Sequence, residues 1–515
     1  MQVELQTETI AFLTDPATHA ASMGPSAGAV EVIETHISVV VLAGTRAYKL
    51  KRAVKLPYVD FSTAALRLAL CEREVEFNRR AVPDLYLGVK RITRTANGSL
   101  VFDGDGPLVD AVVEMVRFDQ DGLFDRMALR GALTPALLAE LAAAVARLHE
   151  AAPVELADGG ADNIAGVLAI NERALADSGL FAADDVTPFN KAFRRALQRA
   201  APQLERRQRL GKVRHCHGDL HLRNICLFEG HPAPFDCLEF DDTMATVDVL
   251  YDLAFLLMDL WHRGLKPGAN LVLNRYLDAL DESDGVALMP FLMAIRAAVR
   301  AHVSATRAEE PREAANAAAL RREAVSYFNL AQMLLRPVAP RLVAIGGFSG
   351  SGKSTIAAAI AEAVGPPPGA RTLSSDRIRK RMGGVAPTTP LPAPAYRREV
   401  SRAVYETLGR EAEYLLAVGH GVVLDATFRR AEERVRIEEM AVAVDVPFTG
   451  IWLQLAPDKL IQRVAERGAD PSDATAEVIR HQISQFRGPV TWTTVPADGS
   501  IDEVVGRVLA LIGAG

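Results

Sequence analysis

Cysteine is scarce in this chain. Only four of the 515 residues are cysteines, and no two of them form a C-x-x-C pair. The sequence therefore offers neither a disulfide framework nor a cysteine zinc site. We expect Cys216, Cys226 and Cys237 to be small buried side chains in a protein of a reducing compartment.

Targeting and membrane signals are also missing from the sequence. The first residues include Glu4 and Glu8 and lack the basic-then-apolar pattern of a signal peptide. No uncharged apolar run is long enough to cross a bilayer. We therefore expect a cytoplasmic protein without a membrane partner.

A strong charge of either sign is absent as well. The chain has 58 Lys and Arg against 64 Asp and Glu, a formal net charge of −6. This balance gives no electrostatic argument for nucleic acid as a general partner, although it leaves room for a local basic groove. The length predicts two or three domains, because one hydrophobic core does not grow to 515 residues.

The strongest motif begins at Gly347 and matches G-x-x-x-x-G-K-S/T. The run 341–345 before it, apolar after Arg341, predicts a buried strand, and 355–360 predicts the start of a helix. In such a strand–loop–helix unit, backbone N–H groups face a phosphate. We expect a nucleoside triphosphate site, with Lys353 on the β- and γ-phosphates and Ser354 on Mg²⁺. The candidate nucleotide ligands are Gly347, Ser349, Gly350, Ser351, Gly352, Lys353, Ser354 and Thr355.

A second motif, starting at His217, matches H-x-D-x-x-x-x-N, the spacing of a kinase catalytic loop. The following turn predicts a hairpin that returns Asp236 to the neighbourhood of Asn224. Phosphoryl transfer needs a carboxylate to orient and deprotonate the attacking hydroxyl, and oxygen ligands to hold Mg²⁺. We assign Asp219 as the base and Asn224 and Asp236 as metal ligands. The alternative is that His217 and Asp219 only cap a loop.

A lysine and a glutamate upstream fit the same chemistry. The predicted strand 47–51 carries Lys49, which we assign to the phosphates, and Lys51 is an open alternative. The predicted helix 64–81 carries Glu74, our candidate for the carboxylate that pairs with Lys49. The competing interpretation is an exposed helical charge.

Residues from about 31 to 335 resemble the aminoglycoside phosphotransferase (kinase-like) family through the motif residues His217, Asp219, Asn224 and Asp236. The resemblance implies a bilobal fold that uses ATP and Mg²⁺ to phosphorylate a hydroxyl of a small molecule. It places Met115 in the hinge that contacts adenine. One departure is that no glycine-rich loop stands near Thr35. The acidic N-terminal half is compatible with a cationic acceptor such as an aminoglycoside or amino sugar.

Strands alternate with helices after the first motif, which predicts a parallel sheet with its site at the strand C-termini. This region, about 341–515, resembles the P-loop kinases grouped with zeta toxins, gluconate kinases and polynucleotide kinases. The resemblance makes Asp376 the general base, and Arg379 and Asp425 acceptor ligands, with Asp425 also a metal ligand. It makes Arg463 and Arg467 lid residues that stabilise the transferred phosphoryl group. The alternatives are a helix N-cap for Asp376 and a solvated helix face for the two lid arginines.

Two prolines, Pro337 and Pro340, mark the expected domain boundary. The sequence thus predicts an α/β and α+β protein with a kinase-like domain at 1–338 and a P-loop kinase domain at 339–515. Within the first domain we expect an N-lobe at about 28–114 and a C-lobe at about 115–338.

These motifs predict a bifunctional phosphotransferase in which both domains use Mg·ATP and act on hydroxyl acceptors, the second on a small metabolite. One rival is a nucleic-acid 5′-hydroxyl kinase in the second domain. It is disfavoured because binding polyanions usually needs a basic stripe. The other rival is that one domain only binds ATP and regulates its neighbour.

Overall fold

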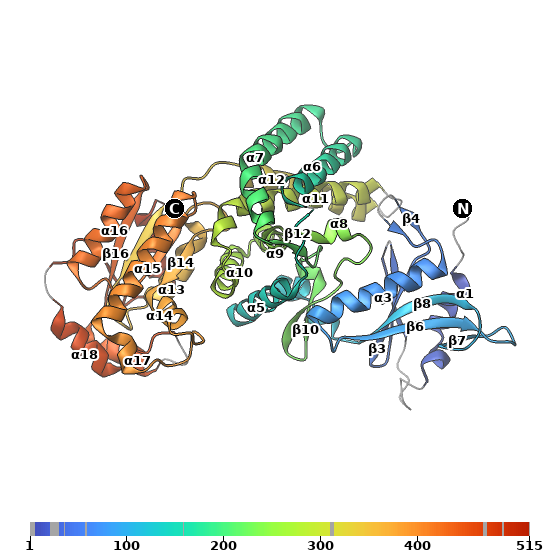
Figure 1. Ribbon diagram of the computed structural model, residues 1–515, viewed down its shortest axis with the longest axis horizontal. Coiled ribbons are helices and arrows are strands. Elements are labelled where there is room, and N and C mark those ends of the chain that lie inside the picture. The colour runs from blue at the N-terminus through green and yellow to red at the C-terminus, as the bar shows by residue number, and fades with distance from the viewer. Residues whose placement is uncertain are drawn as a thin grey trace. The chain divides into compact units, whose positions relative to one another are not determined.

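The computed structural model describes residues 6–20, 30–35, 37–56, 59–157, 159–309, 314–466, 471–486 and 489–513. The chain divides into two compact units, Met1–Asp259 and Leu260–Gly515. Each unit contains a β-sheet and helices, so the fold is mixed α/β (Figure 1). The division falls inside α9 (Val249–His262), and the proline-marked boundary at 338/339 stays a prediction.

The first unit begins with a six-stranded antiparallel sheet in the order β1-β2-β3-β8-β6-β7. Its strands are β1 (Glu31–Glu34), β2 (Ser38–Ala43), β3 (Arg46–Lys51), β6 (Tyr86–Arg94), β7 (Leu100–Phe102) and β8 (Leu108–Val116). Lys49 on β3 lies opposite Val40 on one side and Val113 on the other. Because strand side chains alternate, Ala47, Lys49 and Lys51 share one face of this sheet.

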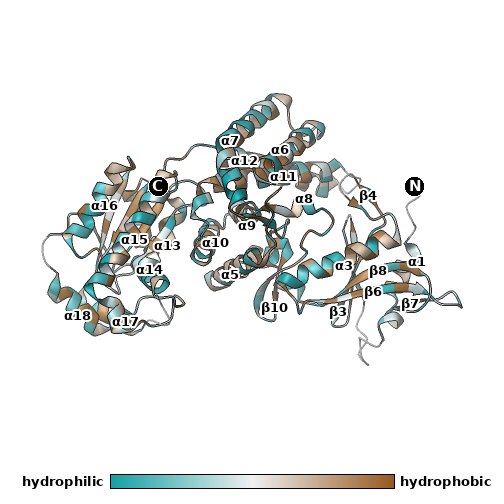
Figure 2. Cartoon of the chain, viewed as in Figure 1, coloured by the Kyte–Doolittle hydropathy of each residue, from teal (hydrophilic) through white to brown (hydrophobic). Residues whose placement is uncertain are grey.

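Helix α3 (Ala64–Ala81) covers that face. Its N-terminus is capped by the Thr63 hydroxyl, which accepts a hydrogen bond from the Leu66 N–H. Cys71 and Val75 of α3 pack into the same apolar cluster as Ala47 of the sheet. Figure 2 shows long hydrophilic stretches on α3, whereas β8 is largely hydrophobic. The helix therefore packs one face on the sheet, chiefly over β8 and β6, and leaves the other to solvent.

The rest of the first unit is mainly helical. Its further helices, before α9, are α1 (Thr7–Thr14), α4 (Phe124–Leu129), α5 (Pro135–Ala151), α6 (Gly160–Asp177), α7 (Ala183–Arg209) and α8 (Asp242–Ala245). Short antiparallel pairs frame the catalytic-loop motif: β9 (Val213–His215) with β12 (Thr246–Asp248), and β10 (Ile225–Phe228) with β11 (His231–Pro234). A further short pair joins β4 (Lys55–Leu56) to β5 (Val59–Asp60).

The second unit is built on a five-stranded sheet in the order β14-β15-β13-β16-β17, with every pairing parallel. The strands are β13 (Leu342–Gly346), β14 (Arg371–Ser374), β15 (Val422–Asp425), β16 (Phe448–Gln454) and β17 (Thr493–Pro496). All five residues of the central strand β13 are buried. A continuous apolar strand of this kind is what a parallel sheet covered on both faces requires.

Helices complete the second unit. They are α10 (Lys266–Ala279), α11 (Met289–Glu309), α12 (Ala314–Leu334), α13 (Lys353–Ile360), α14 (Ser375–Met382), α15 (Arg398–Ala417), α16 (Ala431–Ala443), α17 (Pro457–Ala465), α18 (Ala476–Gln485) and α19 (Ile501–Leu511). Among the described residues, the segment Ser283–Glu309 is long and apolar enough to span a membrane, but 67% of its most apolar stretch is buried inside the protein. Such burial is typical of a core helix.

A buried ion pair joins α3 to the sheet in the first unit. Arg67 Nε lies 2.7 Å from Asp110 Oδ1, and Arg67 Nη2 lies 3.0 Å from Oδ2. Both side chains are 1% exposed. We predict that Asp110→Ala lowers the free energy of unfolding by about 3–5 kcal/mol, because a buried guanidinium loses its countercharge.

Chemical denaturation of the full chain checks this prediction. The control is Asp121→Ala, which removes a carboxylate that is 68% exposed and lies 3.2 Å from Arg130. It should change the free energy of unfolding by less than about 1 kcal/mol. Equal midpoints for the two variants would contradict the prediction.

Candidate active sites

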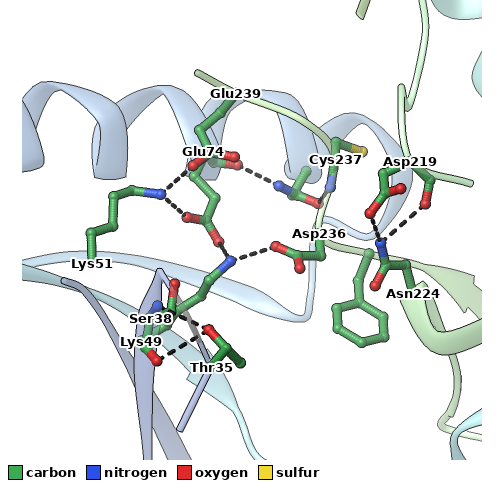
Figure 3. Close-up of polar contacts among 12 residues, drawn as sticks. Thr35, Ser38, Lys49, Lys51, Glu74, Asp219, Asn224, Asp236, Cys237 and Glu239 are labelled. Carbon is green, nitrogen blue, oxygen red and sulfur yellow. Dashed lines mark hydrogen bonds and ion pairs between the residues drawn. The ribbon is translucent and has the colours of Figure 1, made fainter. Parts of the chain in front are cut away.

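The first site centres on two lysines that share one glutamate (Figure 3). Lys49 Nζ lies 2.8 Å from Glu74 Oε1, and Lys51 Nζ lies 2.6 Å from Glu74 Oε2. Lys49 also bonds to Asp236, and Lys51 to Glu239. The structure therefore brings together the pair expected from the sequence, Lys49 and Glu74, and adds Lys51 to it. Their role as nucleotide ligands stays a prediction.

The charges in this cluster support one another. Burial alone raises the pKa of Glu74, but the two ammonium groups outweigh it and hold the pKa at about 2. Burial likewise opposes the charge on Lys49, yet the nearby carboxylates of Asp236 and Glu74 hold its pKa well above the ordinary value. Glu74 and Lys49 are therefore ionised at neutral pH, and each depends on the other.

The catalytic-loop residues lie on the other side of Asp236 (Figure 3). Asn224 Nδ2 donates to Asp219 Oδ2 at 2.9 Å and to the Asp219 carbonyl at 3.0 Å. The hairpin of β10 and β11 pairs the Phe235 N–H with the Asn224 carbonyl at 2.9 Å, which brings the next residue, Asp236, beside the loop. Asp236 has φ +62, in the left-handed region. Oxygens of Asn224 and Asp236 are suitable Mg²⁺ ligands.

Asp252 on α9 holds the catalytic loop in place. Its Oδ1 accepts the Gly218 N–H at 2.9 Å, and its Oδ2 accepts the His217 N–H at 3.2 Å. The same Oδ2 lies 3.1 Å from His149 Nε2. The buried carboxylate accepts hydrogen bonds from two backbone N–H groups of this loop, so it acts as a brace.

Met115 is the residue that the family resemblance places beside adenine. Met115 lies within β8, pairs with Ala47 and Tyr86, and has a buried side chain. A contact between Met115 and adenine stays a prediction.

Glu239 was not predicted as a residue of this site, although the alternation that placed Lys49 on one face of the strand also placed Lys51 there. A second buried lysine calls for a second carboxylate.

The second site starts with the glycines of the loop between β13 and α13. Gly347, Gly350 and Gly352 have φ values of +143, +85 and +90. A Cβ on Gly347 would lie 2.7 Å from Ser351 Oγ, and one on Gly350 would lie 2.7 Å from the Leu460 carbonyl. Only glycine fits this tight cradle.

The cradle fits an anionic ligand. Gly352 is the N-cap of α13 and makes no side-chain cap, so the helix N-terminus keeps its N–H groups for a ligand. Among the described residues, buried Ser351 Oγ has no hydrogen-bond partner. Lys353 Nζ lies 3.0 Å from the Phe348 carbonyl, within the same loop. These features suit the phosphates of a nucleotide.

The candidate metal and acceptor groups lie around the same cavity of about 2030 Å³. Ser354 Oγ donates to Asp425 Oδ2 at 2.6 Å, where β15 ends. Asp376, at the start of α14, lines the cavity with Arg379 and Arg463. Burial raises the pKa of Asp376, and the Asp425 carboxylate raises it further against Lys353 and Arg379. A raised pKa suits a carboxylate that must accept a proton.

Two of the three arginines predicted for this site, Arg379 and Arg463, bond to backbone carbonyls. Arg379 Nη1 lies 2.8 Å from the Ala395 carbonyl, and its buried Nε has no partner in the described part of the chain. Arg463 Nη2 lies 2.9 Å from the Ala497 carbonyl. Arg467 lies outside the described residues. Thr355, at the start of α13, lines the cavity.

Two further residues of this site escaped the sequence analysis. Gln482 on α18 accepts the Ser349 N–H at 3.1 Å and donates to Ser349 Oγ at 3.0 Å. Asp473 accepts from Lys380 at 2.5 Å and from the Leu391 N–H at 3.0 Å. No local motif marks either residue, because their partners are distant in the sequence.

Comparison with known proteins agrees with the two motifs. A model described as "Phosphotransferase enzyme family" matches residues 103–289, and one described as "AAA domain" matches residues 342–489. The uncharacterized protein Rv2004c of Mycobacterium tuberculosis is 32% identical over 460 residues, which cover 87% of this chain and 88% of that protein. The same figures hold for the uncharacterized protein Mb2027c of Mycobacterium bovis. The chain belongs to the family of these mycobacterial proteins.

Solved structures of low similarity cover parts of the chain. A choline/ethanolamine kinase family protein from Mesorhizobium loti has 14% identity and a TM-score of 0.36, and covers 64% of this chain and 99% of its own. A gluconokinase from Sinorhizobium meliloti has 23% identity and a TM-score of 0.25, with coverages of 35% and 93%.

The family matches confirm the two recognised domains and their order. The first is a kinase-like phosphotransferase domain, and the second is a P-loop kinase-like domain whose five parallel strands fit that fold. Both domain types support phosphoryl transfer with ATP.

Glu74 offers a direct test of the first site. We predict that Glu74→Gln lowers ATP turnover at this site by about 10²-fold, because Lys49 and Lys51 lose the carboxylate that holds them in position. A Lys353→Ala background isolates the first site, and consumption of labelled ATP with a panel of hydroxyl compounds is measured. The matched control is Glu72→Gln on the exposed face of the same helix. Similar rates for the two variants would contradict the prediction.

Proposed function

We propose that this protein is a bifunctional ATP-dependent phosphotransferase that acts on hydroxyl groups at two separate sites. The observation that supports it best is that each unit gathers a full set of phosphotransfer side chains. In the first, Lys49 is ion-paired with both Glu74 and Asp236, and Asp219 and Asn224 lie beside them. In the second, the P-loop, Asp425 and Asp376 line one cavity.

At the first site, Asp219 would accept the proton of the attacking hydroxyl. Asn224 donates to the same carboxylate and so orients it. Lys49 would contact the phosphates, with Glu74 keeping it charged. Mg²⁺, held by Asn224 and Asp236, would neutralise charge on the phosphates. The acceptor we favour is a small molecule such as an aminoglycoside, an amino sugar or a related compound.

At the second site, Asp376 would take the proton of a small metabolite's hydroxyl. Ser354 and Asp425 would hold Mg²⁺, and Lys353 would reach the β- and γ-phosphates. Arg379 would contact the acceptor together with Asp425, and the lid arginines Arg463 and Arg467 would stabilise charge on the transferred group. We place this protein in the cytoplasm, where ATP is available to both sites.

Two single variants of the full chain test the bifunctional assignment. We expect Asp219→Asn and Lys353→Ala each to abolish a different transfer reaction when labelled ATP is offered with a panel of acceptors. The panel includes amino sugars, neutral sugars, sugar acids and a single-stranded oligonucleotide. If both variants retain every reaction, the proposal is wrong.

Two other outcomes would select a rival assignment. Labelling of the oligonucleotide that is lost in Lys353→Ala would make the second domain a nucleic-acid kinase. A single reaction lost in one variant, with ATP still bound at both sites, would make the other domain a regulatory module.

The raised pKa of Asp376 predicts a pH dependence. Because the base must be deprotonated, the rate at the second site should rise with pH through a midpoint above about 3.9, the ordinary value for aspartate. Asp376→Asn should abolish this limb and lower the rate by about 10²–10⁴-fold. Asp502→Asn, an exposed carboxylate of α19, is the control. Unchanged acid limbs in both variants would exclude Asp376 as the base.

A further inference from the structure

Helix α10 precedes the P-loop in the second unit and carries three polar side chains on one face. Asn270, Asn274 and Asp278 are spaced by four residues, so they project from the same side of the helix. Asn270 is 3% exposed and Asn274 is 4% exposed. Buried polar groups need partners, and these find them on strand β14 and its flanks.

The Asn274 side-chain amide makes hydrogen bonds to the edge strand β14 that a neighbouring strand would otherwise make. β14 is the edge strand of the parallel sheet, and its Arg371 N–H already donates to the Gly421 carbonyl on the inner side. On the outer side, Asn274 Oδ1 accepts the Thr372 N–H at 2.8 Å, and Asn274 Nδ2 donates to the Ala370 carbonyl at 3.0 Å. Two backbone groups at this edge of the sheet, the Thr372 N–H and the Ala370 carbonyl, are thereby paired.

Asn270 extends this contact along the chain. Its Nδ2 donates to the Ala370 carbonyl at 3.0 Å and to the Pro368 carbonyl at 3.1 Å. A Cβ on Gly369 would lie 2.9 Å from the same Nδ2 and 2.5 Å from the Ala361 carbonyl. Glycine at this position, with φ +100, allows the backbone to approach α10 closely.

Asp278 joins the two ends of the segment that carries Asp376. One oxygen lies 2.7 Å from Nη2 of Arg371, at the start of β14. The other lies 3.0 Å from Nη1 of Arg377, in the first turn of α14. Arg371 is 4% exposed, and these guanidinium groups lower the pKa of Asp278 against the effect of burial. One carboxylate thus bridges the residues on both sides of the Ser374–Asp376 turn.

We propose that α10 contributes to the P-loop kinase site by holding its base in position. Asn274 and Asp278 are positioning residues for Asp376. The six contacts from Asn270, Asn274 and Asp278 hold the edge strand and the start of α14 against one helix. A base must stay within hydrogen-bond reach of its proton, and a shift of about 1 Å is enough to lower a rate by about 10²-fold. This inference rests on the proposed role of Asp376 as the base.

α10 and the segment that carries Asp376 are matched by two different family models. α10 lies inside residues 103–289, which the phosphotransferase model matches, whereas β14 and α14 lie inside 342–489. A helix of one matched segment thereby completes the sheet edge of the other.

The test uses the full chain with Asp219→Asn, so that ATP turnover reports the second site, and Mg·ATP alone is the probe. We expect Asp278→Asn to lower kcat for ATP hydrolysis by about tenfold and to speed hydrogen exchange of amides 372–382 by about tenfold. KM for ATP and exchange of the loop 349–355 should stay unchanged, because the partners that Asp278 holds, Arg371 and Arg377, lie outside that loop. Asp278→Glu should restore part of the kcat.

The matched control is Glu413→Gln, an exposed carboxylate on α15 outside the cavity lining. It should leave kcat, KM and exchange unchanged. If Asp278→Asn does not fold, Arg377→Gln takes its place, since it removes one arm of the cluster at a side chain that is 26% exposed.

Two results would overturn the inference: wild-type kcat and exchange in the α10 variant, or equal acceleration of exchange at 349–355 and 372–382. The proposed function fails separately. If Asp376→Asn leaves both ATP hydrolysis and the Lys353-dependent transfer to acceptors unchanged, Asp376 is not the base, and a kcat loss in Asp278→Asn could no longer be assigned to it.

Discussion

Phosphoryl transfer requires carboxylates that repel one another to stand close together beside a highly charged ligand. In the first unit, Glu74, Asp236 and Glu239 gather around Lys49 and Lys51, and the ammonium groups keep Glu74 ionised although it is fully buried. The neighbouring carboxylates would otherwise push their pKa values upward and neutralise themselves. The buried countercharge is therefore what allows this site to exist.

The second unit also places carboxylates close together, but there the pKa of one carboxylate is raised and not lowered. Asp376 and Asp425 line one cavity with Lys353 and Arg379, and there burial and mutual repulsion prevail, so the pKa of Asp376 is raised. A low pKa favours a group that anchors a cation, whereas a raised pKa favours a group that accepts a proton. Glu74 and Asp376 thus suit different tasks. Glu74 is ion-paired directly with two ammonium groups, whereas Asp376 is influenced most by burial and by the neighbouring Asp425 carboxylate.

The contact between α10 and β14 changes how the domain plan is understood. Composition places a boundary at the prolines 337 and 340, and the family models leave α10 on one side and the P-loop on the other. By its contacts, however, α10 pairs backbone groups at the β14 edge of the P-loop sheet and bonds to a buried arginine, Arg371. An edge strand with unpaired N–H and C=O groups needs such a cover.

The sequence by itself determined the two families, their order, the mixed α/β fold and the motif residues, including Asp219, Asn224, Lys353 and Ser354. These follow from fixed local spacing, because a loop that wraps a phosphate or a metal uses neighbouring backbone and side chains. Only the tertiary structure decided that Lys51 shares Glu74 with Lys49, that Gln482 holds the P-loop, and that Asp278 bridges Arg371 and Arg377. Those partners are brought together by the packing of distant segments, and no periodicity or motif encodes which buried charge will meet which.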